Sequence, residues 1–171
     1  MKAISLHQPW ASLVAHGVKL IETRSWPLSG RGPLLIHAAK TWNFDLDRIC
    51  RSEPFRAALE SFGVAFPDPD RTDRRFRLPP RPRGLPFGAV VGRVEVLDCV
   101  RIEPFRKSYE RPETPQFVVP PYPRENEFAF GDYTPGRWAW LCVNAVALDT
   151  PVACVGRQGV FEVEDAVEEV A

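Results

Sequence analysis

The feature that most constrains this chain is a run of charge set among apolar residues near its amino terminus. Residues 17–24, GVKLIETR, place Lys19, Glu22 and Arg24 within six positions of a segment that otherwise has the pattern of a buried strand. A strand tolerates such charges at a sheet edge, or where a cleft gives them something to bind. The run therefore predicts either an ion network that closes one end of the fold or the floor of a binding site.

Local pattern predicts how these three side chains lie. A short helix, begun by a proline and ended by Gly17, comes before a strand over 18–24. Glu22 and Arg24 have the same strand parity and should project from one face, whereas Lys19 lies at the turn and is not bound to that parity. A carboxylate between two cations stays ionised and fixes their side chains, which suits a pre-formed pocket.

The rest of the chain predicts an α+β fold, built as a small β-barrel with flanking helices. Alternating or wholly apolar runs indicate strands, and capped segments with helical spacing of apolar residues indicate helices. Thr41 or Asn43 is placed to cap one helix and Ser52 the next, which Gly63 ends. The expected strands are 1–7, 18–24, 34–38, 88–102, 137–143 and 160–163, and the expected helices are 8–17, 43–51, 54–62 and a short one near 104–110.

Length and composition indicate one domain with an insertion. The 171 residues are enough to bury one core, and no boundary divides them, so we expect a single domain over 1–171. Residues 67–86 hold six prolines and six arginines against three aspartates, a composition that excludes regular structure. We expect a solvated insertion there that buries no core face, with an arginine-rich arm on nucleic-acid backbone as the alternative.

Several functional classes are excluded by what the sequence lacks. The four cysteines, Cys50, Cys99, Cys142 and Cys154, are too widely spaced for a metal knuckle, so we expect no metal and free, mostly buried thiols. Without a glycine-rich phosphate loop or a nucleophile elbow, neither a cofactor nor a serine triad is expected. The absence of a signal peptide and of a long apolar run predicts a cytoplasmic protein with no membrane partner.

The net charge of the chain is zero, so any electrostatic attraction to nucleic acid needs a local patch of positive charge.

Four further residues and one loop are candidates for function. Trp10, near a helix start, favours the core, whereas Trp26, beside a proline in a loop, can stack a base. His37 lies in a buried run and favours a satisfied core histidine over a catalyst. Asp132, in a turn late in the chain, can reach the pocket as a further carboxylate. The proline-rich loop at 111–124 leaves open a protein-interaction module.

Three motifs together resemble those of the ASCH domain family, which is named for the homology domain of the activating signal cointegrator. They are HQPWASL at 7–13, a GxKxxExR pattern followed by SerTrp at 17–26, and RGPL at 31–34. The resemblance is strongest over 4–40 and continues more loosely through 88–98 and 138–161. It implies a PUA-like fold, which relatives use in RNA binding and RNA modification. It also implies a nucleotide-sized cleft lined by Gly17, Lys19, Glu22 and Arg24.

The resemblance implies nucleic acid, and RNA foremost, as the partner. In that hypothesis the phosphates are held by basic side chains, and Trp26 stacks a base of a single-stranded or splayed nucleotide. The residues expected to hold phosphates are Lys19, Arg24, Arg31 and Lys40.

An amidohydrolase is the alternative. Some small members of the wider family resemble amidases that remove the acetyl group from N4-acetylcytidine, with a lysine, a threonine three residues later and a distant glutamate in the site. Lys19 matches here, but Glu22 occupies the place of the threonine, and Thr23 should point to the other strand face. The enzyme hypothesis therefore makes Lys19 and Glu22 an acid/base pair that acts on a modified nucleoside, with water as nucleophile.

Overall fold

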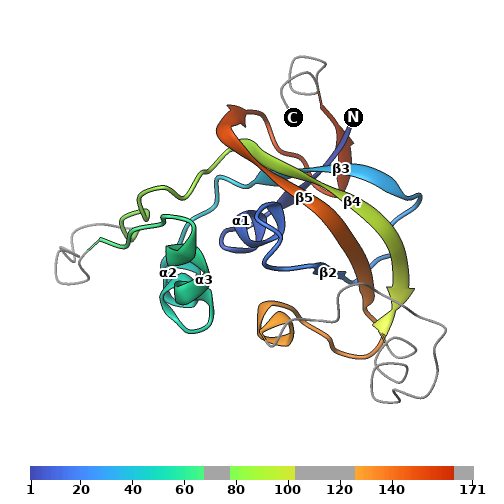
Figure 1. Ribbon diagram of the computed structural model, residues 1–171, viewed down its shortest axis with the longest axis horizontal. Coiled ribbons are helices and arrows are strands. Elements are labelled where there is room, and N and C mark those ends of the chain that lie inside the picture. The colour runs from blue at the N-terminus through green and yellow to red at the C-terminus, as the bar shows by residue number, and fades with distance from the viewer. Residues whose placement is uncertain (68–77, 103–125, 164–171) are drawn as a thin grey trace.

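The computed structural model describes residues 1–67, 78–102 and 126–163. One six-stranded sheet has the order β2-β5-β4-β3-β1-β6, with β1 and β3 parallel and the other pairs antiparallel. It curls around helix α1 as an open half-barrel (Figure 1), which confirms the predicted α+β fold. The strands are β1 (Lys2–Leu6), β2 (Ile21–Arg24), β3 (Gly32–Ala38), β4 (Ala89–Arg101), β5 (Trp138–Ala153) and β6 (Val160–Glu162), and the helices are α1 (Trp10–Ala15), α2 (Phe44–Arg51), α3 (Phe55–Ser61) and the short 3-10 helix η2 (Glu127–Phe130).

Local capping signals confirm most of the predicted helix ends. Gly17 has φ +65° and its N–H donates to Val14 O at 3.0 Å, which ends α1. The Asn43 side chain accepts the N–H of Leu46 at 2.9 Å and so caps α2. Ser52 does not cap α3, because its hydroxyl donates backwards to Ile49 O at 2.8 Å.

Strand β5 extends ten residues beyond the end predicted for it at 143. It pairs with β4 from Arg101 opposite Trp138 to Ala89 opposite Ala153. The register shifts at three places along this ladder, and Asn144 has φ 50°. Each bulge changes which face the following residues occupy, so the alternation that marks a strand is lost although the backbone pairing continues.

The described part of the predicted insertion packs against the helices, which corrects the expectation that it buries no core face. Leu85 is 6% exposed and lies in a small core with residues of α2 and α3. The indole N–H of Trp42 donates to Pro79 O at 3.0 Å, which ties this arm to the segment before α2. Residues 68–77, the helix expected near 104–110 and the loop at 111–124 lie outside the described residues.

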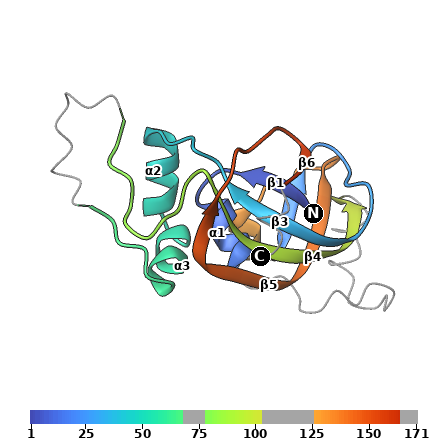
Figure 2. The ribbon, with the colours of Figure 1, turned by 90° about the horizontal axis from the view of Figure 1, so that it is seen from above.

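The main core lies between the concave face of the sheet and α1, while α2 and α3 pack beside the barrel (Figure 2). Gly92 permits the close approach of α1, because a Cβ there would lie 2.8 Å from the Cβ of Ala15. All four cysteines are free, and burial raises the pKa of the Cys50 and Cys142 thiols to about 12. Within the described ranges, no helix is long and apolar enough to cross a membrane.

His37 is a core histidine whose ring is fully hydrogen-bonded. Its Nε2 lies 3.1 Å from Cys154 O and its Nδ1 lies 3.0 Å from Ser5 Oγ. A carbonyl oxygen can only accept, so Nε2 carries the proton and Nδ1 accepts from the serine hydroxyl. Burial lowers the pKa of His37 below its usual 6.5, and the charge of Lys40 lowers it further, although the bond to the Cys154 carbonyl acts in the opposite direction.

The lowered pKa predicts how stability depends on pH. The unfolded chain binds the proton more readily than the folded chain, so this contribution is complete above about pH 6.5 and is lost as the pH falls. We expect the midpoint of thermal unfolding to decrease between about pH 7 and about pH 5.5, with a shallower slope in His37→Gln. Burial also lowers the pKa of His16, so part of the pH dependence of the unfolding midpoint should remain in His37→Gln. If the unfolding midpoint depends on pH equally in the parent and in His37→Gln, His37 is not the source of this pH dependence.

Candidate functional site

The charged run ends in β2, the outermost strand at one end of the sheet, which holds Glu22 and Arg24, while Lys19 lies just before it. The N–H of Cys142 in β5 donates to Leu20 O at 2.8 Å, and Glu22 lies opposite Trp140. Hydrogen bonds to the neighbour alternate along an antiparallel strand, so the backbone groups of Ile21 and Thr23 face away from β5. These backbone groups at the free edge of β2 therefore need hydrogen-bond partners that no neighbouring strand supplies.

Three charged side chains supply those partners. The Glu127 carboxylate accepts the N–H groups of Leu20 at 2.8 Å and of Ile21 at 3.0 Å. The Lys19 ammonium donates to Ile21 O, and Arg137 donates to Thr23 O at 3.2 Å. Charged side chains thereby form hydrogen bonds with the backbone groups at the free edge of β2.

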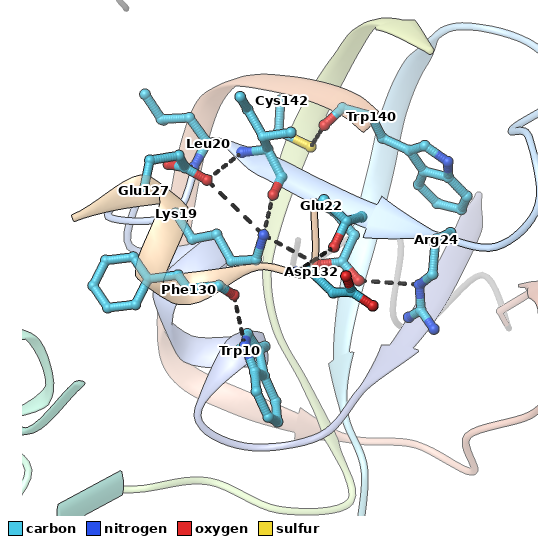
Figure 3. Close-up of polar contacts among 12 residues, drawn as sticks. Trp10, Lys19, Leu20, Glu22, Arg24, Glu127, Phe130, Asp132, Trp140 and Cys142 are labelled. Atoms are coloured by element: carbon cyan, nitrogen blue, oxygen red, sulfur yellow. Dashed lines mark hydrogen bonds and ion pairs between the residues drawn. The ribbon is translucent and has the colours of Figure 1, made fainter. Parts of the chain in front are cut away.

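A chain of charges that alternate in sign is formed by Glu127, Lys19, Glu22 and Arg24 (Figure 3). Lys19 is 1% exposed, and its Nζ lies 3.9 Å from Glu127 Oε1 and 3.6 Å from Glu22 Oε2. Glu22 Oε1 in turn lies 3.0 Å from Arg24 Nε, and Arg24 also donates to Ser5 O at 3.2 Å. The structure therefore brings Lys19, Glu22 and Arg24 together, with the carboxylate of Glu22 between the two cations.

Glu127 is the member of this cluster that the sequence analysis missed. It is fully buried in η2, far from β2 along the chain, and no spacing rule connects the two segments. The available signal was a lone carboxylate in the otherwise apolar run EFAF. Tyr133 OH donates to Glu127 Oε1 at 3.2 Å. Burial, and then the charge of Glu127, raise the pKa of Tyr133, so its phenol remains protonated and a donor.

A cavity of about 350 Å³ opens beside the cluster, between β2 and the segment from η2 to Arg137. Asp132 reaches it, as expected, and its backbone N–H donates to Thr23 Oγ1 at 3.2 Å. Hydrogen bonds from Thr134 lower the pKa of the Asp132 carboxyl. The residues that line the cavity include Trp10, Lys19, Glu22, Thr23, Asp132 and Arg137.

One expectation about the cavity walls needs correction. Thr23 lines the cavity together with Glu22, because the cavity lies at the free edge of β2, where residues of both parities reach it. Trp10 also lines the cavity, and its Nε1 donates to Phe130 O at 2.8 Å, which ties α1 to η2. Trp10 packs against two apolar clusters as well, as expected from the core role that the sequence favoured.

The other residues expected to bind nucleic acid lie elsewhere. Trp26 is half-buried and packs edge to face on Trp140, with ring centroids 4.8 Å apart. Arg31 forms an exposed ion pair with Asp98. Lys40 lines a different cavity. None of these three lines the cavity beside Lys19, and their part in binding remains a prediction.

The charges at this cavity are paired. Lys19 lies near two carboxylates, Arg24 Nε contacts Glu22, and Arg137 Nε lies 3.3 Å from Asp132 Oδ2. A ligand with both hydrogen-bond donors and acceptors suits such a surface, whereas a bare anion would have to compete with carboxylates already in place.

Comparison with known proteins identifies the family. The family model of the ASCH domain matches residues 4–152. The chain is similar to activating signal cointegrator 1 of Homo sapiens and of Mus musculus, each 29% identical over 106 residues. These matches cover 62% of this chain but 16% of each relative, so the chain corresponds to a small part of those proteins.

Solved structures of ASCH from Zymomonas mobilis also match, at 14% sequence identity. The first has a TM-score of 0.48 and the match covers 98% of this chain and 90% of that one. A point mutant of the same protein has a TM-score of 0.48, with 98% and 93% of the two chains covered.

The buried cluster predicts a large stability cost for removing its cation. Lys19→Ala leaves the carboxylates of Glu22 and Glu127 without their ammonium, and we expect the free energy of unfolding in urea to fall by about 3–5 kcal/mol. The matched control is Arg48→Ala, which breaks the exposed pair with Asp45 and should cost less than about 1 kcal/mol. Similar losses in the two variants would show that the cluster does not hold the edge of β2.

Proposed function

This chain belongs to the ASCH domain family, and we propose that it binds single-stranded nucleic acid, RNA foremost, by taking one unstacked base into the cavity beside β2. The observation that carries the proposal is the cavity itself, which combines a tryptophan wall with paired charges. The resemblance of the GxKxxExR segment to that of RNA-binding relatives supports the same site.

The size of the cavity suits one nucleotide. Small-molecule pockets in proteins typically span about 300–1,000 Å³, and this cavity of about 350 Å³ lies at the small end of that range. Sequence-specific contacts to RNA are made mostly to single strands, whose bases can be splayed into pockets and stacked on aromatic rings. Trp10 supplies such a ring at the cavity wall.

The polar groups of the cavity suit the edge of a base. Glu22 and Asp132 offer carboxylate oxygens to base N–H groups, and Arg137 offers N–H donors to ring nitrogens or carbonyl oxygens. Lys19 has a supporting role, because its ammonium already contacts Ile21 O and two carboxylates.

Filling the cavity tests the proposal. Ala129 is exposed and lines the cavity, so Ala129→Trp should block it without disturbing the core. We expect Ala129→Trp to bind a fluorescent single-stranded RNA at least about tenfold more weakly at low salt, since base stacking contributes about 1–3 kcal/mol. The readout is fluorescence anisotropy.

Ala57→Trp is the matched control, because Ala57 is exposed on α3 and does not line the cavity. Equal affinities of the parent, Ala129→Trp and Ala57→Trp would show that no base enters this cavity.

A second candidate function, hydrolysis of a modified nucleoside, is favoured by one observation. Lys19 and Thr23 line the cavity, and Lys19 Nζ lies 3.9 Å from the buried Glu127, a glutamate distant in sequence. These are the residue types used by the related amidases. In this hypothesis Glu22 takes a proton from water and the hydroxide adds to the acetyl carbon of N4-acetylcytidine. The C–N bond then breaks and the leaving nitrogen receives the proton, which gives cytidine and acetate.

Chromatography of a reaction with N4-acetylcytidine tests the enzyme. We expect cytidine to appear with the parent protein and its rate of release to fall about 100-fold or more in Glu22→Gln, which removes the general base. Asp45→Asn, an exposed carboxylate on α2, is the control and should leave the rate unchanged. No release by the parent, or equal release by the parent and Glu22→Gln, would contradict the hypothesis.

A further inference from the structure

The four residues expected to hold phosphates differ in whether they have carboxylate partners. Lys19, Arg24 and Arg31 each lie within an ion pair. Lys40 is exposed and has no carboxylate partner among the described residues. Of these four cations, Lys40 alone in the described chain can therefore receive an anion without breaking an existing pair.

Lys40 lies at the mouth of a second cavity, of about 320 Å³. This cavity is bounded by the end of β3, the start of β4, the segment after β5 and the end of β6. Arg157 lines it as well and, like Lys40, has no carboxylate partner in the described part of the chain. Glu162 is the acid among the described lining residues, and its carboxylate is 73% exposed and lies 3.9 Å from the amino group of Met1.

The backbone around Lys40 holds its side chain in place. Gly88 has φ +67°, and a Cβ at this position would lie 2.7 Å from Lys40 Cγ, so the lysine stem crosses the space that the glycine leaves. Arg81 donates to Lys40 O at 2.8 Å, and its guanidinium lies 4.2 Å from the centre of the Phe87 ring. Arg81 is thereby tied to the backbone of Lys40 and to the Phe87 ring.

We infer that this second cavity is an anion site that receives phosphate groups of the nucleic-acid backbone. The inference rests on the proposed function for the source of the phosphate. The site itself rests on Lys40 and Arg157, which line one cavity and have no carboxylate partner among the described residues, and on Arg81, which donates to the backbone carbonyl of Lys40. Lysine and arginine bind phosphate oxygens through charge-assisted hydrogen bonds, and neither Lys40 nor Arg157 forms an ion pair with a carboxylate of the described residues.

Residues next to each cavity meet at the carboxyl end of β1. Arg24, whose Nε lies 3.0 Å from the Glu22 carboxylate of the first cavity, donates to Ser5 O, and Ala39, which precedes Lys40 of the second cavity, donates its N–H to Leu6 O at 2.8 Å. In this proposal one strand reaches both cavities. The first, with paired charges, takes the base, and the second, with two cations that have no carboxylate partner among the described residues, takes the backbone.

The test is the double variant Lys40→Gln/Arg157→Gln, measured by fluorescence anisotropy with single-stranded RNA at several salt concentrations. We expect at least about tenfold weaker binding, and the slope of log affinity against log salt should flatten by about 1.4, since each phosphate contact on a single strand contributes about 0.7. The matched control is Arg48→Gln/Arg56→Gln. It removes two charges from exposed helix pairs and should leave the slope unchanged.

An oligonucleotide without bases separates this inference from the proposed function. Lys40→Gln/Arg157→Gln should lose affinity for the base-free strand, whereas Ala129→Trp should not. If the double variant binds RNA with the same slope as its control, the anion site is overturned and the base cavity stands. If Ala129→Trp has no effect on RNA while the double variant loses affinity, the base cavity is overturned and the anion site stands. Displacement of RNA by millimolar inorganic phosphate at constant ionic strength would overturn the backbone as the source and assign the site to free phosphate.

Discussion

The candidate site depends on how the free edge of β2 is closed. A sheet edge in a protein interior must find partners for each outward N–H and C=O group, since an unpaired buried group costs about as much as a lost hydrogen bond. Here Glu127 accepts the N–H of Ile21, Lys19 donates to Ile21 O and Arg137 donates to Thr23 O, so side chains take the place of another strand. Because a short helix and a turn lie along this edge, the contact is less continuous than a paired strand would make it, and a cavity remains beside β2.

This arrangement is compatible with both interpretations of the charged run, an ion network that closes one end of the fold and the floor of a binding site. A buried ion pair is often no more stabilising than apolar residues of similar size, but apolar side chains would leave the N–H and C=O of Ile21 without partners. Lys19 and Glu127, 1% and 0% exposed, are thus required for the edge itself. Glu22 is slightly more exposed and, with Asp132 and Arg137, faces the cavity. One network therefore closes the edge of β2 and presents polar groups to the cavity.

Much of the fold was predictable because the signals that determine it are local. Gly17, Asn43 and Gly63 end or begin helices through contacts within a few residues, and the parity of Glu22 and Arg24 follows from strand geometry alone. The missed features depend on contacts between distant segments. Glu127 acquires its role by packing against β2, β5 continues because β4 offers a partner beyond the bulges, and Leu85 is buried by helices that come earlier in the chain.

The same distinction explains how the proposed nucleic-acid sites are compatible with a chain that has no net charge. Charge counts from the sequence weigh every arginine equally, whereas an arginine or lysine in contact with a carboxylate has little attraction left for a phosphate. Pairing neutralises most of the cations near β2 and leaves Lys40 and Arg157 without carboxylate partners in the described chain. The described lining of the second cavity thus holds two cations, Lys40 and Arg157, against one carboxylate, Glu162, and only the folded arrangement of the side chains brings these charges together.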